Sequence, residues 1–249
     1  DAAESVDGAS ALSEAFRLAL SGSTAQHLLA YAGDLLVGYA QRADVSADDS
    51  AAELVVHPDH RRRGVGAALL GRLPGAVHLW AHSSGSATTG FIAASGLRAV
   101  RRLFVLRRPL GAQAGGDAAL PAPRLPAGLV ARPFVVGQDE AGWLATNTAA
   151  FADHPEQGRV TLTDLQARMG QDWFDPEGFL LVVPHGAPAG AAAADGEAAL
   201  APAPTVAAFH WTKIEPDSAS ATRVGEVYVV GVHPAYQGHG LGREATLLG

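Results

Sequence analysis

One short pattern occurs twice in this sequence and carries the residues best suited to bind a phosphate group. The first copy, His57–Gly66, reads HPDHRRRGVG, and the second, His233–Gly242, reads HPAYQGHGLG, at an offset of 176 residues (233 minus 57). The glycines allow positive φ and a close approach of the backbone to a ligand. Successive N–H groups then point into one concavity at the positive end of a helix. We therefore predict a pyrophosphate site in each copy.

Other phosphate-binding loops match the pattern less well. Neither copy contains the Gly-Lys-Ser/Thr of a P-loop. The dinucleotide fingerprint has a formal match at Ala245 in the second copy, but the first copy has Leu69 there and Ser83–Gly85 where an acidic residue belongs. The His-Pro turn also makes the loop longer than that fingerprint allows.

Each loop needs a strand that leads into it and a helix that follows it. Hydrophobic periodicity predicts this order twice, with a strand at 51–56 and a helix at 65–72, and with a strand at 226–232 and a helix at 241–248. Further helices are predicted at 10–20, 87–95, 140–151 and 162–171, and further strands at 27–32, 35–41, 77–81, 97–107, 179–184 and 205–213. The order predicts an α/β fold that occurs twice.

Stretches rich in Gly, Ala and Pro mark the domain boundaries. We predict an N-terminal domain at 1–110, a linker at 111–127 and a C-terminal domain at 128–249, with a flexible loop at 186–204 inside the second domain. The second half contains no counterpart of 77–107, so we expect its domain to be incomplete at the C-terminus.

Composition excludes several classes of protein. The 249 residues are 48% hydrophobic and 17% charged, with a net charge of -7 at pH 7, which disfavours a nucleic-acid partner. The chain has no cysteine, and it has no apolar run near the roughly 20 residues of a membrane span. We expect a soluble, cytoplasmic monomer that binds neither nucleic acid nor membrane.

The loop pattern after a β-strand resembles the acetyl-coenzyme A loop of the GNAT superfamily of N-acetyltransferases. Four stretches of the second half resemble the mycothiol synthase family within it: Ala150–Gly158, Trp173–Pro176, Phe209–Lys213 and Gly225–Val232. The resemblance covers nearly the whole chain. It implies two tandem GNAT domains, each with a mixed, mostly antiparallel sheet flanked by helices, and the second of them incomplete.

The resemblance also implies a reaction and a cofactor site. The reaction is transfer of acetyl from acetyl-CoA, the co-substrate, to the cysteinyl amine of desacetylmycothiol, a cysteinyl-glucosaminyl-inositol, as the last step of mycothiol biosynthesis. The residues expected to bind acetyl-CoA are the end of each strand and the loop after it: Leu54, Val55, Val56, Arg62, Arg63, Gly64, Val65, Gly66 and Ala67, and then Val230, Gly231, Val232, Gln237, Gly238, His239, Gly240, Leu241, Gly242 and Arg243.

Glu226 is the candidate general base. An amine must lose a proton to attack, because alkyl amines are mostly protonated at neutral pH. Glu226 lies on the strand before the second loop, in an apolar context that predicts little solvation. The offset places Ser50 at its position in the first domain, and strand alternation points Glu53 to the other face. Gly231 is consistent with a β-bulge that would turn the N–H groups of 230–232 toward an oxyanion.

A general acid must protonate the leaving thiolate. In this superfamily it is commonly a tyrosine four residues before a glycine, but that position before Gly96 holds Ile92, with Phe91 beside it. We therefore expect the first domain to bind acetyl-CoA without catalysing transfer. In the second domain the tyrosine is expected beyond Gly249, and Tyr228 and Tyr236 are poor substitutes.

For the acceptor substrate, the resemblance points to Glu14, Glu156, Lys213 and Glu226. Their carboxylate and ammonium groups suit a cysteinyl amine and sugar hydroxyls. No His pair is completed by a carboxylate or cysteine cluster, so no metal is expected. Two alternatives remain open: an N-acetyltransferase for another amino sugar or peptide amine, and a non-catalytic acetyl-CoA-binding sensor.

Overall fold

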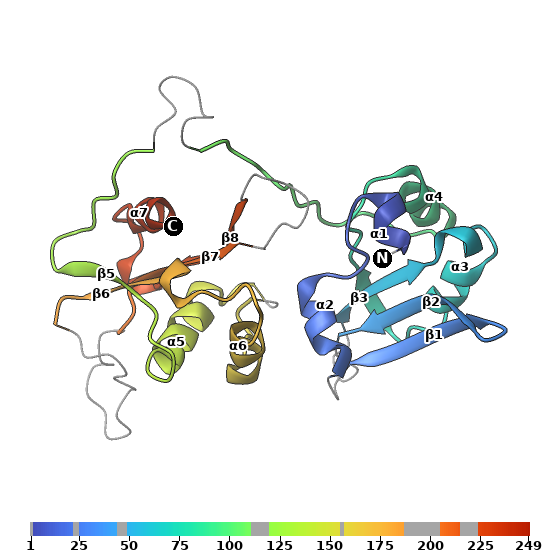
Figure 1. Cartoon of the computed structure of the whole chain (residues 1–249), viewed down its shortest axis with the longest axis horizontal. Helices are drawn as coiled ribbons and strands as arrows, with labels where there is room; N and C mark the ends of the chain where they lie inside the picture. The colour runs from blue at the N-terminus through green and yellow to red at the C-terminus, as the bar shows by residue number, and fades with distance from the viewer. Residues whose placement is uncertain are drawn as a thin grey trace. The chain divides into compact units, whose positions relative to one another are not determined.

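The computed structural model divides the chain into two compact units, Asp1–Leu106 and Arg107–Gly249 (Figure 1). It describes residues 2–21, 25–43, 49–110, 120–154, 157–186, 205–214 and 224–249. Most of the predicted linker at 111–127, and nearly all of the predicted loop at 186–204, lie outside these ranges. The predicted domain boundaries stay predictions.

Unit 1 is built around a four-stranded mixed sheet with the order β1-β2-β3-β4. β1 and β2 form a hairpin, β3 pairs with β2 antiparallel, and β4 pairs with β3 in parallel. The elements are α1 (Ala2–Asp7), α2 (Glu14–Leu18), η1 (Ala19–Ser21), β1 (Gln26–Ala32), β2 (Leu35–Arg42), β3 (Asp49–Val56), η2 (Pro58–His60), α3 (Val65–Leu70), β4 (Ala76–Leu79) and α4 (Ser86–Ala94).

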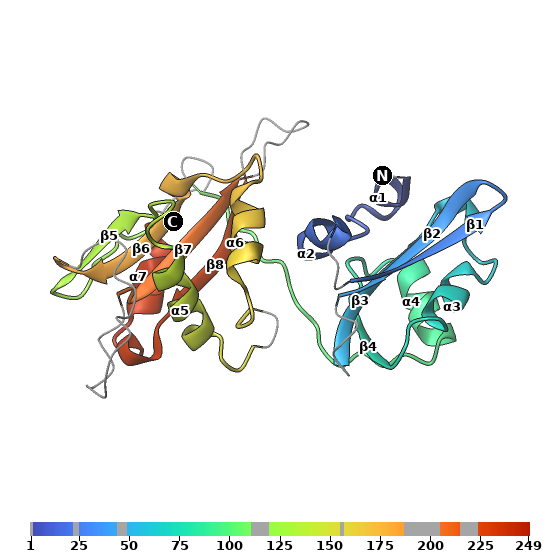
Figure 2. The ribbon, with the colours of Figure 1, turned by 90° about the horizontal axis from the view of Figure 1, so that it is seen from below.

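The two faces of the unit 1 sheet differ in chemistry. On one face, Ala40 and Ala52 pack with Leu69 of α3 in an apolar cluster. On the other face, the buried polar side chains of Gln41 and Glu53 lie opposite each other. In Figure 2, α1 and α2 lie on one side of this sheet and α3 and α4 on the other. The loop helix α3 is therefore held by the apolar face.

The prediction of a strand at 97–107 is wrong: the structure forms no strand there. The segment contains arginines and apolar residues, but Phe104, Val105 and Leu106 are 75–89% exposed. A strand needs a neighbour to satisfy its N–H and C=O groups, and no described strand pairs with this segment. Composition alone therefore did not predict whether the segment has a strand to pair with.

Unit 2 is a four-stranded sheet with the order β5-β6-β7-β8, in which every described pairing is antiparallel. Trp143 of α5 packs with Phe179 and Trp211 on one face, while Leu241 and Ala245 of α7 pack on the other. Its elements are β5 (Leu129–Pro133), α5 (Glu140–Ala150), α6 (Leu162–Met169), η4 (Pro176–Gly178), β6 (Phe179–Pro184), β7 (Ala208–Ile214), β8 (Gly225–Val232), η5 (Pro234–Tyr236) and α7 (Leu241–Leu248). Neither β5 nor α1 of unit 1 was predicted.

Candidate functional site

The second loop is held in shape by two of its own side chains. The His233 Nδ1 atom accepts a hydrogen bond from the Ala235 amide at 3.1 Å and so caps η5. Burial lowers the pKa of the His233 imidazole, which favours the neutral ring that can accept this bond. The side-chain Nε2 atom of Gln237 donates a hydrogen bond to the Val232 carbonyl at 3.1 Å. The turn is thus fixed to the end of β8 before the glycines begin.

The first loop uses the same two contacts. His57 Nδ1 accepts from the Asp59 amide at 3.3 Å, and Arg61 Nε donates to the Val56 carbonyl at 3.2 Å. The other two nitrogens of Arg61 bind both Asp7 oxygens at 2.7 Å, and this ion pair lowers the pKa of Asp7. The repeated His and Arg/Gln positions are therefore explained by loop geometry.

Backbone amides are the groups that the second loop offers to a ligand. Gly238 and Gly240 adopt φ of 85° and 76°, in the left-handed region that favours glycine. The amides of 238–242 donate to no acceptor in the part of the chain that the structure describes. In the first loop, Gly64 has φ of 83°, and Arg62 has φ of 60° in spite of its side chain. Each loop ends in a helix whose first turn follows a left-handed glycine.

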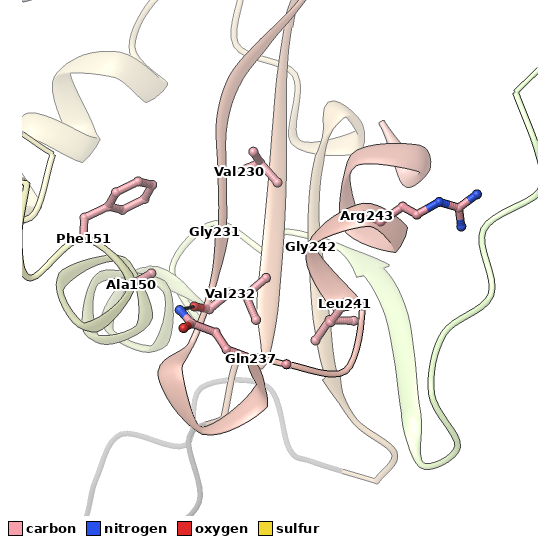
Figure 3. A pocket seen from close by; sticks show the side chains of 11 residues that line it. Ala150, Phe151, Val230, Gly231, Val232, Gln237, Leu241, Gly242 and Arg243 are labelled. Atoms are coloured by element: carbon pink, nitrogen blue, oxygen red, sulfur yellow. Dashed lines mark hydrogen bonds between the residues drawn. The ribbon is translucent and has the colours of Figure 1, made fainter.

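A cavity of about 430 Å³ lies against this loop, as Figure 3 shows. All the predicted cofactor residues of the second copy line it except His239. Two lining residues were not predicted as contacts: Ala150, the last residue of α5, and Phe151 after it. Both residues belong to Ala150–Gly158, one of the stretches that resemble the family. That resemblance was the one sequence feature that could have indicated them. The lining residues are Ala150, Phe151, Val230, Gly231, Val232, Gln237, Gly238, Gly240, Leu241, Gly242 and Arg243.

A β-bulge lies in β8, but not at Gly231. Trp211 of β7 pairs with Val229 and Thr212 pairs with Val227, which leaves Tyr228 as an extra residue. Gly231 pairs regularly, and its missing side chain serves packing instead. Bulges insert a residue and change which side chains share a face. The expectation of a bulge centred on Gly231 is corrected accordingly.

The bulge sets the surroundings of Glu226. Glu226 pairs directly with Lys213, and directly opposite residues project to the same face. Lys213 is two residues from Trp211, so this face is the aromatic one. Glu226 is exposed, contrary to the expectation from its apolar context, because it is the second residue of a strand at the edge of the described sheet. Lys213, by contrast, is only 5% exposed.

The bulge also corrects the comparison between the two units. Gly38 pairs with Val56 in unit 1 as Ala208 pairs with Val232 in unit 2. Three residues after these positions, Gln41 in unit 1 is equivalent to Trp211 in unit 2. Gln41 pairs with Glu53, as Trp211 pairs with Val229. Because β8 has one extra residue, Glu53 and not Ser50 lies on the face equivalent to that of Glu226.

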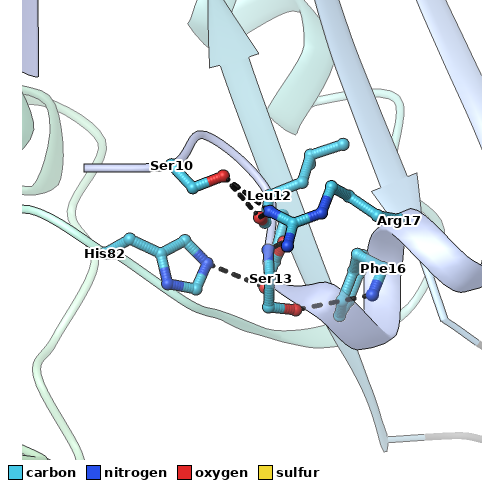
Figure 4. A network of polar contacts seen from close by, with 7 residues as sticks. Ser10, Leu12, Ser13, Phe16, Arg17 and His82 are labelled. Atoms are coloured by element: carbon cyan, nitrogen blue, oxygen red, sulfur yellow. Dashed lines mark hydrogen bonds and ion pairs between the residues drawn. The ribbon is translucent and has the colours of Figure 1, made fainter. Parts of the chain in front are cut away.

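Glu53 is, however, fully engaged. It is 1% exposed, with one oxygen 2.8 Å from the His82 Nε2 atom and the other accepting the Ser13 amide at 2.8 Å. Ser13 is also the N-cap of α2, and its hydroxyl accepts from the Phe16 amide. Figure 4 shows Ser13 and His82 in this network. The carboxylate thus ties α2 and the segment after β4 to the sheet.

The remaining predicted site residues are placed as follows. Glu14 is the first residue of α2 and is half-buried, and Glu156 lies outside the described residues. Leu54, Val55 and Val56 end β3. Within the described ranges, no group of three or more His, Asp or Glu side chains could hold a metal ion, and no helix is long and apolar enough to cross a membrane.

Comparison with known proteins identifies the family and fold of the two halves. Residues 23–105 match the family profile "Acetyltransferase (GNAT) domain", and residues 146–246 match "Acetyltransferase (GNAT) family". A GCN5-related N-acetyltransferase from Sphaerobacter thermophilus aligns with a TM-score of 0.56 at 20% identity, covering 99% of this chain and 75% of that one. A tandem GNAT protein from the clavulanic acid biosynthesis pathway aligns with a TM-score of 0.56 at 17% identity, covering 99% and 78%. These matches confirm the predicted fold of two tandem GNAT domains.

Curated relatives carry a narrower name. A mycothiol acetyltransferase from Parafrankia sp. (strain EAN1pec) is 44% identical over 271 residues, which cover all of this chain and 78% of the relative. A mycothiol acetyltransferase from Streptomyces avermitilis is 46% identical over 257 residues, which cover all of this chain and 75% of the relative. The family resemblance seen in the sequence is thereby confirmed.

Proposed function

Because this chain belongs to the mycothiol acetyltransferase family of tandem GNAT N-acetyltransferases, we propose that it acetylates the cysteinyl amine of desacetylmycothiol with acetyl-CoA. The observation that carries the proposal is the continuity of one segment of unit 2. Glu226 stands on β8, the strand that leads into the open amide loop at 238–242, and Lys213 stands opposite it on β7. The candidate base for the acceptor amine and the candidate site for the diphosphate are thus connected by one strand, β8.

The second loop suits the diphosphate of acetyl-CoA. Its amides at 238–242 have no protein acceptor among the described residues, and Gly240 and Gly242 leave no side chain in front of them. When bound, acetyl-CoA supplies an activated acetyl group. The proposed contacts from this chain are the backbone of Val230–Val232, the loop, the first turn of α7, and Phe151, which follows α5 and lines the cavity.

Glu226 is proposed to receive the amine proton. The carboxylate takes a proton from the acceptor ammonium, directly or through water, so that the neutral nitrogen can attack the acetyl carbon. As the C–N bond forms and the C–S bond breaks, CoA leaves as its thiolate, and the second proton that the nitrogen loses passes through solvent to that sulfur. Lys213, opposite Glu226, is proposed to bind acceptor oxygens. Tyr228 is not proposed as the general acid, because its hydroxyl accepts a hydrogen bond from Arg168 Nε at 2.9 Å and its ring is packed between tryptophans.

Unit 1 is proposed to bind acetyl-CoA without transferring acetyl. Its loop has the same turn contacts and the same left-handed glycine as the loop of unit 2. Glu53, a carboxylate on the equivalent face, is buried and bound on both oxygens, so it is not available to take a proton from an amine.

The proposal is tested by mass spectrometry of the acetylated product, because the acceptor itself carries a thiol that confuses thiol assays. The chain is incubated with acetyl-CoA and desacetylmycothiol, glucosamine or a cysteinyl peptide. We expect acetylation of desacetylmycothiol to be fastest. Preferred acetylation of another amine, or cofactor binding with no product, would support the other acetyltransferase or the sensor instead.

A further inference from the structure

A buried ammonium lies against two aromatic rings in unit 2. The Lys213 Nζ atom is 4.8 Å from the centroid of the Trp173 ring and 5.6 Å from that of Tyr228. Both distances lie within the range of about 6 Å in which a ring face attracts a cation. Lysine is almost never buried without such compensation. The rings therefore help to compensate for the burial of a lysine that is only 5% exposed.

The rings are themselves fixed by their neighbours. The Trp173 and Tyr228 centroids are 4.9 Å apart, and Trp211 lies 5.7 Å from Trp173 and 5.1 Å from Tyr228. Arg168 of α6 donates from Nε to the Tyr228 hydroxyl at 2.9 Å. Because the bulge makes Tyr228 the extra residue of β8, its ring can join this face without displacing Glu226. The cage around Lys213 consists of two partly buried rings that pack against the aromatic core of unit 2.

This arrangement suits a lysine that binds a ligand. A ring face attracts the charge of the ammonium and takes up none of its hydrogen bonds to oxygen. The three N–H groups of the ammonium can therefore still donate to oxygen atoms while the rings hold the charge in place. A flexible four-carbon side chain loses conformational freedom when it binds, and holding it in place beforehand reduces that loss. Because Glu226 pairs with Lys213 across the two strands, both side chains leave the sheet on the same face.

We infer that Trp173 and Tyr228 are positioning residues of the acceptor site, which hold the Lys213 ammonium where it donates to the hydroxyl groups of a polyol-bearing amine. This inference rests on the function proposed above, because it takes Lys213 as an acceptor contact. It adds that the aromatic cage, and not Lys213 alone, sets the affinity for the acceptor. Trp173 and Tyr228 act through Lys213 and touch no reacting atom.

The test is calorimetric titration of desacetylmycothiol into the full chain saturated with CoA. We expect Trp173→Leu to raise the acceptor Kd about tenfold, because a desolvated cation–π contact is lost. Trp173→Phe keeps a ring and should restore most of the affinity. The Kd for acetyl-CoA should not change in either variant. Phe174→Leu is the matched control: Phe174 also packs on Trp211, at 5.8 Å, and its loss should leave the acceptor Kd unchanged.

A double-mutant cycle separates positioning from general loss of structure. In a Lys213→Met background, Trp173→Leu should cause no further loss of acceptor affinity, because the residue it positions is gone. Additive losses, or an acceptor Kd unchanged by Trp173→Leu alone, would overturn the inference. Tight acceptor binding by the unmutated chain without any product would instead overturn the proposed reaction, while the effect of Trp173→Leu on binding still supports the cage.

Discussion

The ring of Phe209 on β7 fills the space that a side chain at Gly231 on β8 would need. A Cβ atom at position 231 would lie 2.6 Å from the Phe209 Cζ atom and 3.4 Å from the Ala150 Cβ atom. Gly231 and Ala150 also line the cavity beside the second loop. The glycine therefore lets β8 approach Phe209 of the aromatic core closely. It also forms part of the wall of the proposed cofactor site.

Gly231→Ala should lower the free energy of unfolding of unit 2. The added methyl group forces the Phe209 ring out of place, and overpacking of this kind costs about 1–3 kcal/mol. Urea unfolding checks this. Gly225→Ala, on the same strand, is the control, since its Cβ would meet only Thr212 at 3.7 Å. Equal effects of the two substitutions would contradict the packing role.

Arg62→Gly should make the first loop more stable and weaken its binding of an anion. Arg62 has φ of 60°, whereas the second loop has Gly238 at the same place. A left-handed conformation costs a non-glycine residue roughly 1–2 kcal/mol. Hydrogen exchange of the α3 amides reports the stability, and titration with CoA reports the binding. Arg63→Gly removes the same charge without relieving a positive φ, and faster exchange in both variants would argue against strain at Arg62.

Unit 2 should lose stability as the pH falls below 6.5, in part through His210. Its Nδ1 atom lies 2.9 Å from the Ala245 carbonyl, and its Nε2 atom is buried with no hydrogen-bond partner among the described residues. Burial lowers the pKa of His210 from 6.5. Because the folded-state pKa is depressed, the stabilising contribution is present above 6.5 and is lost as the pH falls through the folded value.

The Tm measured between about pH 7.5 and about pH 5.5 should therefore fall less in His210→Leu than in the unmutated chain. His185→Gln serves as the control, because His185 is exposed. If the pH dependence of the Tm is the same in His210→Leu as in the unmutated chain, His210 does not contribute to the loss of stability at low pH.

Glu53 should matter for the structure of unit 1 and not for the reaction. Glu53→Leu leaves the Ser13 amide without its acceptor, and a buried unsatisfied group costs about 1–3 kcal/mol. Glu53→Gln keeps an acceptor and should be milder. Product formation by Glu53→Gln should equal that of the unmutated chain, and its loss would mean that unit 1 takes part in catalysis.

Local sequence patterns predicted the loops well, because a glycine with positive φ and a turn capped by its own side chain depend on few residues. His57 and His233 are examples. The bulge at Tyr228 could not be predicted in the same way, since a bulge is a property of two paired strands. The sequence offset placed Ser50 on the face equivalent to that of Glu226 and Glu53 on the opposite face. The extra residue in β8 reverses these two positions.

Long-range partners account for the other differences. Nothing near Lys213 in the sequence indicates that Trp173 holds its ammonium, although both lie in stretches that carried the family resemblance. Phe151 lines the cavity because α5 ends beside β8. The segment at 97–107 has strand-like residues without a described strand to pair with, so its composition predicted a strand that does not form.

Glu226 is proposed to take the proton from the acceptor amine, and Glu226→Gln tests this role most directly. The substitution keeps the size of the side chain and removes its basicity, and general bases contribute about 100-fold or more to the rate. We predict that Glu226→Gln binds acetyl-CoA with an unchanged Kd and forms acetylated desacetylmycothiol at least about 100-fold more slowly at neutral pH. Turnover equal to that of the unmutated chain, with cofactor binding retained, would contradict the account.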